Sequence, residues 1–249
     1  MRILITNDDG IYSPGIAALA QVASDYGEVR VVAPDVEMSS AGHSITHSRP
    51  LTFKRTPIKG IDAYRVNGTP ADCVALGTFT WEKVDLVLSG INLGSNIGNG
   101  MWHSGTLAGA KQAALLGLRG IAFSTPATDE EPKFETLKPW VSRCMELLLD
   151  AKELCLVNVN LPAHPPKGIR WTRQSVRHYD GKVVPIKDPM GRTLYWSTVV
   201  AIEETEAGTD RWAVQNDFVS MTPLRLDITD EKMLAEATTR HPVEQVLFT

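Results

Sequence analysis

Residues 2–10 of the chain are RILITNDDG, a short apolar run that ends in two adjacent aspartates and a glycine. The apolar, β-prone residues predict a buried strand at Arg2–Thr6, with Asp8 and Asp9 at its carboxyl end. In an open α/β sheet, ligands bind outside the carboxyl ends of the strands. Adjacent side chains of a regular strand point to opposite faces, but Gly10 permits a bend that brings both carboxylates to one point. We therefore expect a hard cation at Asp8 and Asp9.

Strand and helix patterns alternate over the first 161 residues. Ser13-Pro14 and Thr69-Pro70 each place a capping residue before a proline, which predicts the start of a helix. Strands separated by helices predict a Rossmann-like, three-layer α/β sandwich with a mostly parallel sheet. The other expected strands are 29–33, 85–89, 120–124 and 154–159, and the other expected helices are 106–118 and 134–150.

The pattern changes after Leu161, where three prolines follow within five residues. Short β-like runs at 169–173, 194–201 and 218–221 predict hairpins appended to the main sheet, and residues 230–239 predict a final helix. We expect a single domain over residues 1–249, with a Rossmann-like core at 1–161. Residues 162–249 would then form a β-rich arm with a helical segment, used in oligomerisation.

The composition of the 249 residues excludes several classes of partner. The net charge is −4 and there is no basic stripe, which argues against binding of a nucleic acid duplex. No apolar run approaches the roughly 20 residues of a membrane span, and no signal peptide is recognisable, so we expect a cytoplasmic protein without a membrane partner. Cys73, Cys144 and Cys155 lack metal-ligand spacing and are predicted to be reduced, buried thiols.

Two further segments that follow strands carry oxygen donors. Ser39 lies in a small polar loop after the second strand, and Asn92 lies in a glycine- and asparagine-rich loop at residues 90–100. Each loop could be only a structural turn, but glycine-rich loops at strand ends often admit a ligand. Because carboxylate, hydroxyl and amide oxygens suit Mg²⁺ or Mn²⁺ better than Zn²⁺, we expect one of the former.

A possible anion site follows in the same loop and the next helix. Free N–H groups at the start of the helix that begins near Thr106 would attract a phosphate. Asn96, Ser104 and Gly105 would add donors, and His103 could protonate a leaving oxygen or bind the phosphate. A plain helix cap is the alternative for Ser104 or Thr106. A hard metal beside a phosphate cradle predicts phosphoryl hydrolysis.

Two alternatives from other classes stay open. A nucleotide-binding regulatory module would keep the metal and the glycine-rich loop but release no phosphate. A dinucleotide-dependent oxidoreductase is disfavoured, because no G-x-G-x-x-G follows the first strand. Within phosphoryl hydrolysis, the adjacent Asp8 and Asp9 differ from the Asp-x-Asp of haloacid-dehalogenase-type phosphatases, which favours direct attack by water.

These motifs, in this order, resemble the SurE family, survival proteins that act as metal-dependent 5'/3'-nucleotidases. The resemblance rests on the stretches ILITNDDGIYSPG (3–15), VVAPDVEMS (31–39), GTPADC (68–73), DLVLSGINLGSNIG (85–98), SGT (104–106), NVNLP (158–162) and VSMTPLRLDIT (219–229).

The resemblance implies a set of site residues and substrates. It implies one divalent cation per subunit, held by Asp8, Asp9, Ser39 and Asn92, and phosphate contacts from Asn96, Ser104, Gly105 and Thr106. The implied substrates are nucleoside 5'- and 3'-monophosphates and, for some members, short polyphosphate. It also implies a C-terminal part that joins subunits into a homodimer or homotetramer. This chain departs from many relatives at Ser40, where they have glycine, and at Gln112, where they often have glutamate.

Overall fold

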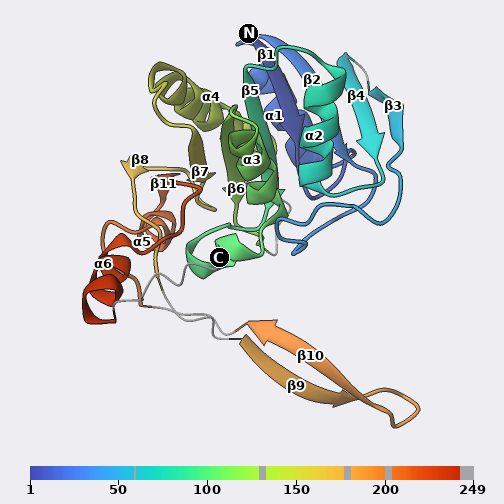
Figure 1. Cartoon of the computed structure of the whole chain (residues 1–249). Helices are drawn as coiled ribbons and strands as arrows, with labels where there is room; N and C mark the ends of the chain where they lie inside the picture. The colour runs from blue at the N-terminus through green and yellow to red at the C-terminus, as the bar shows by residue number, and fades with distance from the viewer. Residues whose placement is uncertain (59, 129–132, 177–180, 200–203, 242–249) are drawn as a thin grey trace, which may run out of the picture.

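The computed structural model describes residues 1–58, 60–128, 133–176, 181–199 and 204–241. Its centre is a nine-stranded sheet in the order β3-β4-β2-β1-β5-β6-β7-β11-β8 (Figure 1). The sheet strands are β1 (Arg2–Thr6), β2 (Glu28–Pro34), β3 (Phe53–Ile58), β4 (Ile61–Val66), β5 (Leu86–Leu93), β6 (Arg119–Thr125), β7 (Leu156–Asn160), β8 (Gly168–Trp171) and β11 (Phe218–Pro223). A separate antiparallel hairpin consists of β9 (Gly181–Lys187) and β10 (Thr193–Val199).

The six strands from β4 to β7 are parallel, so their carboxyl ends share one edge of the sheet. Both faces of the sheet are covered, as parallel sheets require. In β1, for example, Ile3 and Ile5 pack in the hydrophobic cluster on one face while Leu4 packs in the cluster on the other. The predicted α/β sandwich is therefore confirmed.

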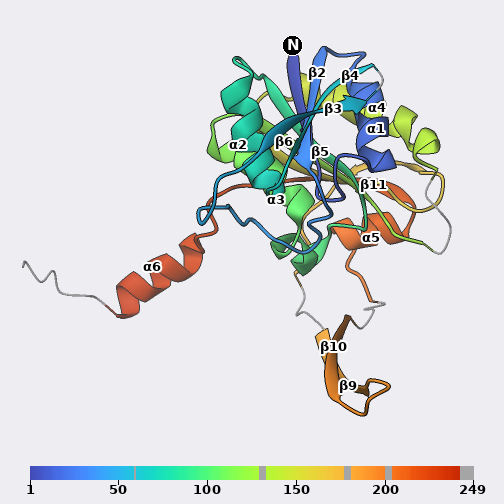
Figure 2. The same cartoon turned by 90° about the vertical axis from the view of Figure 1, so that its right-hand side faces the viewer.

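Helices form the two outer layers. The helices are α1 (Pro14–Ala23), α2 (Pro70–Thr80), α3 (Gly105–Leu115), α4 (Phe134–Asp150), α5 (Asp210–Gln215) and α6 (Glu231–Arg240), with a 3₁₀ helix η1 (Gly98–Trp102). Helices α1 and α4 pack together on one face of the sheet, and α2 and α3 on the other (Figure 2). The Ser13 and Thr69 side chains cap α1 and α2, as their positions before a proline predicted.

The C-terminal half differs from the sequence-based expectation. Strands β8 and β11 belong to the main sheet itself, because β11 pairs with β7 and β8 pairs with β11. The core sheet therefore extends beyond residue 161, and among the described residues β9–β10 is the hairpin that lies apart from it (Figure 1). Residues 200–201 of the strand expected at 194–201 lie outside the described residues.

Three further features bear on the sequence-based expectation: strand β3, helix α6 and the burial of the cysteines. Strand β3 was not expected, because Lys54, Arg55 and Pro57 break the apolar pattern; charges and proline are typical of an edge strand, which β3 is. The final helix α6 forms as expected, but it extends away from the central sheet (Figure 2), and none of its residues is buried. Cys73 and Cys144 are buried thiols, whereas Cys155 is exposed.

Among the described residues, no helix combines the length and apolar character needed to cross a membrane.

Candidate active site

A cavity of about 510 Å³ opens at the carboxyl edge of the sheet, where β1 and β5 end. Its lining contains most of the predicted site residues. The lining residues are Asp8, Ser39, Ser40, Asn92, Leu93, Gly94, Ser95, Asn96, Gly100, His103 and Ser104. Asp9, Gly105 and Thr106 adjoin this lining without being part of it. The structure therefore brings the predicted residues to one place, although they come from four separate segments of the chain.

The turn after β1 is organised by Asn7, which is completely buried. Its Nδ2 donates to the carbonyl oxygen of Gly10 at 3.0 Å and to Oγ of Ser13 at 2.7 Å. Gly10 has a φ of +96°, a conformation that L side chains rarely adopt. The N–H of Met38 donates to the carbonyl of Asp8 at 2.7 Å, which ties the loop after β2 to the same turn. The expected bend at Gly10 is confirmed.

Asp8 lies against the first turn of α3 and is only 4% exposed. Oγ1 of Thr106 donates to Oδ1 of Asp8 at 2.6 Å. A Cβ at Gly105 would stand 2.8 Å from Oδ2 of Asp8, so glycine allows the helix to approach this closely. Burial raises the pKa of Asp8, although the hydrogen bonds from Thr106 act in the opposite direction. An anionic Asp8 therefore gains from a positive partner.

Asp9 lies beside Asp8 and is also perturbed. Burial, together with the charge of Asp8, raises the pKa of Asp9 to about 6. The N–H of Leu93 donates to Oδ2 of Asp9 at 3.3 Å. The charges that raise these two pKa values are other carboxylates, with Glu37 acting on both. This is a concentration of negative charge that a cation would neutralise.

The other two predicted cation ligands differ in burial. Asn92 is 8% exposed and lies within β5, which continues past Ser89 with an irregularity in its pairing to β6; the expected loop therefore begins later. Nδ2 of Asn92 donates to the carbonyl of Gly94 at 2.6 Å, so Oδ1 is the end of the amide left to serve a cation. Ser39 is exposed, and its Oγ donates to Oε1 of Glu37 at 2.7 Å.

Asn96 has a different environment from the one expected of a phosphate donor. Its Nδ2 donates to Oγ of Ser124 at 2.8 Å and to Oγ1 of Thr106 at 3.3 Å. The carbonyl oxygen of Asn96 accepts from Nδ2 of Asn158 at 2.7 Å and from Nδ2 of Asn160 at 3.1 Å. Both side-chain amide hydrogens of Asn96 are therefore bound to protein oxygens. Asn96 could donate to a phosphate only if one of these two hydrogen bonds were broken.

The start of α3 carries the remaining predicted residues. Oγ of Ser104 accepts from the N–H of Leu107 at 2.9 Å and so caps the helix. The hydroxyl of Thr106 is committed to Asp8. His103 follows η1 as its C-terminal cap and lines the cavity, and its carbonyl accepts from the N–H of Gly42 at 3.1 Å. The cap and the anion-site interpretations are compatible, because a capped helix still presents its first N–H groups.

Four polar residues behind the site were not predicted to act there. They are Asn7, Ser124, Asn158 and Asn160, all completely buried. The available signal was polarity at strand positions: Asn158 and Asn160 alternate along β7, where apolar residues would be expected. Such a buried amide pair indicates a polar partner on a neighbouring segment, which here is the backbone of Asn96.

The residues present fit a hard divalent cation. The four candidate ligands offer only oxygen, and two of them are carboxylates whose pKa values are raised by burial and by neighbouring negative charge. Within the described parts of the chain, no three His, Cys, Asp or Glu side chains are grouped so as to hold a metal. This donor chemistry favours Mg²⁺ or Mn²⁺ over a His- or Cys-ligated metal.

The fold and the site together define an α/β sandwich protein with an acidic, oxygen-lined site beside the N-terminus of a helix. The chain belongs to the SurE family, whose model, described as survival protein SurE, matches residues 3–181.

Curated relatives and a solved structure agree with this assignment. The 5'-nucleotidase SurE 1 of Thermus thermophilus is 48% identical over 235 residues, which cover 92% of this chain and 93% of the relative. The 5'-nucleotidase SurE of Deinococcus radiodurans is 44% identical and covers 97% of this chain and 93% of its own length. The crystal structure of the SurE protein from Aquifex aeolicus matches with a TM-score of 0.84 at 40% identity, over 96% of this chain and 99% of that chain.

Proposed function

We propose that this protein is a metal-dependent phosphomonoesterase that hydrolyses nucleoside 5'- and 3'-monophosphates to nucleoside and phosphate. The observation that carries the proposal is the position of Asp8, at the carboxyl end of β1 and against the first turn of α3. In this proposal, the cation ligands and the phosphate donors at the start of α3 would act at the same cavity. The 5'-nucleotidase names of the Thermus and Deinococcus relatives support the reaction and the substrate class.

Each residue has a role in the proposed reaction. Asp8, Asp9, Ser39 and Asn92 would hold one Mg²⁺ or Mn²⁺, which supplies positive charge to the phosphate and lowers the pKa of water. Asp8 or Asp9 orients the attacking water or accepts its proton. The first N–H groups of α3, at Gly105 and Thr106, face the charge that develops on the phosphate, together with Ser104 and Asn96.

His103 is the proposed proton donor to the leaving oxygen, because it lines the cavity next to the start of α3. Direct attack by water predicts inversion of configuration at phosphorus in a chiral phosphorothioate substrate. Retention of configuration, or a trapped aspartyl-phosphate, would contradict it. The variant His103→Gln should slow substrates with a poor leaving group more than those with a good one.

We further propose that residues beyond 161 join subunits in a homodimer or homotetramer. The hairpin β9–β10 exposes Tyr195 and Trp196, with exposed fractions of 73% and 63%. Helix α6 has no buried residue, although isolated helices of this length are marginal in water. Light scattering of the full chain tests this proposal, and a monomer at micromolar concentration would contradict it.

The experiment that tests the function measures inorganic phosphate released from a panel of 5'- and 3'-nucleoside monophosphates and short polyphosphate. Each substrate is assayed with Mn²⁺, with Mg²⁺ and with EDTA. We expect release that EDTA removes and added metal restores. No release under any metal, from protein shown to be folded, would instead favour a nucleotide-binding module without turnover.

A further inference from the structure

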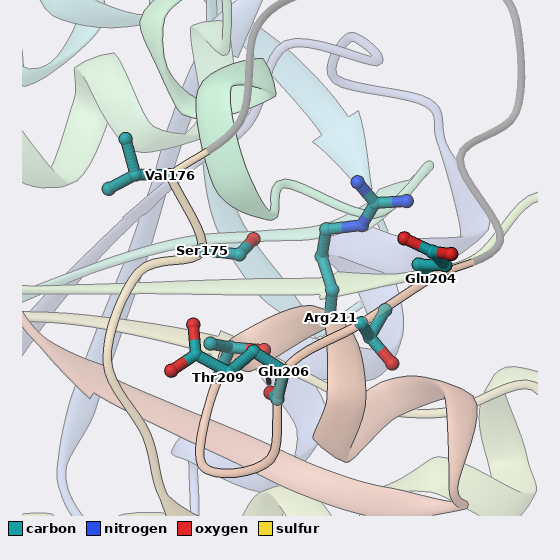
Figure 3. Close-up of a pocket in the computed structure, with 7 residues that line it drawn as sticks. Ser175, Val176, Glu204, Glu206, Thr209 and Arg211 are labelled. Atoms are coloured by element: carbon teal, nitrogen blue, oxygen red, sulfur yellow. Dashed lines mark hydrogen bonds between the residues drawn. The ribbon is translucent and has the colours of Figure 1, made fainter.

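Two segments that precede and follow the hairpin β9–β10 in the sequence lie side by side. We call residues 173–175 and 209–211 the arm root. The carbonyl of Arg173 accepts from the N–H of Asp210 at 3.0 Å, and Arg173 forms a parallel bridge with Thr209. Figure 3 shows Ser175 on the outgoing segment near Thr209 and Arg211 on the returning one. The arm root is therefore a folded part of the molecule.

Asp210 is the buried centre of the arm root, with no exposed surface. Its Oδ1 accepts from the N–H of Ser175 at 2.9 Å and from the N–H of Arg211 at 2.7 Å. Its Oδ2 accepts from the N–H of Gly98 at 2.9 Å, across 112 residues of sequence. A buried carboxylate is costly unless it is fully hydrogen-bonded, and one of its three partners here belongs to the loop that lines the candidate active site.

Gly98 is held from both sides by the arm root. Its carbonyl oxygen accepts from Nε2 of Gln174 at 3.0 Å, and its N–H is bound by Asp210. Its φ is +54°, and a Cβ at this position would stand 2.7 Å from Oγ of Ser175. The backbone at Gly98 therefore has little freedom to shift while the arm root is intact.

This contact reaches the candidate active site through a short path. Asn96 and Gly100, on either side of Gly98, both line the catalytic cavity. Nδ2 of Asn96 contacts Oγ1 of Thr106, and that hydroxyl donates to Asp8. A displaced Gly98 would thus alter both the wall of the cavity and the support of a proposed metal ligand.

We propose that Asp210 is a positioning residue for catalysis: by binding Gly98, it sets the loop at residues 94–100 in its catalytic position. The proposal rests on the proposed hydrolysis of phosphomonoesters. It also makes the two arm-root residues that bind Gly98, Asp210 and Gln174, part of the support of the site, in addition to the sheet edge. Misplacement of catalytic groups by about 1 Å can cost roughly 100-fold in rate, so a positioning role should appear in kcat.

The test replaces Asp210 by its isostere, Asp210→Asn. The remaining oxygen can still accept from Ser175 and Arg211, but the new amide nitrogen faces the N–H of Gly98 and cannot bind it. We expect kcat to fall about 10- to 100-fold, with KM changed less than threefold. Amide hydrogen exchange of the peptide that covers residues 96–100 should accelerate in the same variant.

The matched control is Thr209→Ala, one residue earlier. Thr209 is 1% exposed, donates to the carbonyl of Glu206 at 2.6 Å and caps α5, whereas the two hydrogen bonds to Gly98 come from Asp210 and Gln174. Its loss should lower stability through the cap while leaving kcat and exchange at 96–100 within twofold of wild type. A second variant, Gln174→Met, removes the other hydrogen bond to Gly98 without touching a buried charge and should lower kcat several-fold. It replaces Asp210→Asn as the test if that variant does not fold.

The outcomes separate this proposal from the proposed function. Wild-type turnover with an unchanged kcat in Asp210→Asn, or in Gln174→Met where the former is unfolded, contradicts the positioning role alone. A loss of kcat in Thr209→Ala equal to that in Asp210→Asn also contradicts it, because general destabilisation would then explain both. No phosphate release by the wild type contradicts the proposed function and, with it, this proposal.

Discussion

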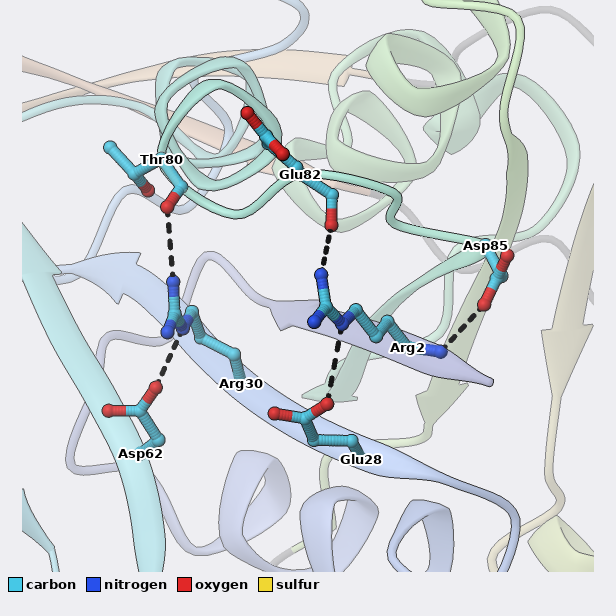
Figure 4. A network of polar contacts seen from close by, with 7 residues as sticks. All are labelled: Arg2, Glu28, Arg30, Asp62, Thr80, Glu82 and Asp85. Atoms are coloured by element: carbon cyan, nitrogen blue, oxygen red, sulfur yellow. Dashed lines mark hydrogen bonds and ion pairs between the residues drawn. The ribbon is translucent and has the colours of Figure 1, made fainter.

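Acidic side chains at the two edges of the central sheet differ in whether they have basic partners. At the amino edge, Arg2 pairs with Glu28 at 3.3 Å, and Arg30 pairs with Asp62 at 2.7 Å (Figure 4). The guanidinium of Arg30 also lies 4.8 Å from the centre of the Trp81 ring. Each of these acidic groups has a basic partner, and the arrangement needs no ligand to be complete.

At the carboxyl edge, Asp8 is only 4% exposed, whereas the side chains of Glu28 and Asp62 at the amino edge are 66% and 34% exposed. The pKa values of Asp8 and Asp9 are raised by burial and by neighbouring carboxylates, and in the described parts of the chain no basic group acts to lower them. Asp8 and Asp9 therefore do not contribute to the stability of the fold, since a buried charge without an oppositely charged partner is costly. The acidic groups of the amino edge are therefore neutralised by basic side chains, whereas the carboxyl edge keeps an excess of negative charge that the proposed cation would neutralise.

A third carboxylate shows that position at the carboxyl edge does not by itself raise a pKa. Asp72, in the first turn of α2, is 2% exposed. It accepts hydrogen bonds from the N–H and hydroxyl of Thr46 at 3.0 and 2.7 Å and from the N–H of Thr69 at 2.9 Å. Burial acts to raise the pKa of Asp72, but these bonds outweigh it and lower the pKa below its usual value.

The largest expected difference between the edges is in catalysis. Asp8→Asn should lower kcat/KM by roughly 1,000-fold, as loss of a charge-stabilising group in an active site does, without lowering the stability of the metal-free protein. Asp62→Asn, at the amino edge, should leave kcat/KM within twofold and cost at most about 1 kcal/mol. Phosphate release and urea unfolding measure both. Full activity of Asp8→Asn would mean that the site is assigned wrongly.

Bound metal should raise the free energy of unfolding of the protein, and this gain should depend on the carboxylates of the carboxyl edge and not on those of the amino edge. At 100 times its dissociation constant, Mn²⁺ should raise the free energy of unfolding of the wild type by about 2.7 kcal/mol, and EDTA should reverse this. Asp9→Asn should lose most of the gain, whereas Asp62→Asn should keep it. Thermal unfolding with and without Mn²⁺ is the measurement. An equal shift in the wild type and Asp9→Asn would place the cation elsewhere.

Asp72→Asn should lower the free energy of unfolding by about 2 kcal/mol at pH 7, because hydrogen bonds to a buried charged group are lost. The folded-state pKa of Asp72 is lowered, so the ionised group contributes stability above its unfolded pKa of about 3.9. That contribution is lost as the pH falls through the lower, folded-state pKa. The difference between wild type and variant should therefore stay constant from pH 5 to 8 and narrow below pH 4. A difference that stays constant down to pH 3 would disprove the role of the charge.

The smallest expected effect concerns backbone strain, which occurs at both edges. Ser40, which lines the cavity, has a φ of +61°, and Lys83, near the amino edge, has a φ of +60°. A non-glycine residue in this conformation costs about 1 kcal/mol, partly offset by the flexibility that glycine adds to the unfolded chain. Ser40→Gly and Lys83→Gly should each stabilise the protein by about 0.5 kcal/mol in urea unfolding. Destabilisation by either change would show that its side chain contributes contacts that outweigh the strain.

Local chemistry made much of this protein predictable. The apolar run before Asn7, the φ that Gly10 must adopt, and the paired cap and proline at Ser13 and Thr69 depend on near neighbours in the chain. Such features are set by backbone sterics and by hydrogen bonds over three or four residues. A mostly parallel sheet then followed from the strand–helix alternation, and with it the position of Asp8 and Asn92 at one edge.

Only the tertiary structure decided which partner each polar group has. The donors of Asn96 are directed to Ser124 and Thr106, and Asp210 holds Gly98 from 112 residues away. The membership of β8 and β11 in the main sheet is of the same kind, since it depends on pairing with β7. The sequence shows which polar groups will need hydrogen-bond partners once they are buried. Which of many possible partners each group finds depends on the packing of distant segments, and no local sequence pattern predicts it.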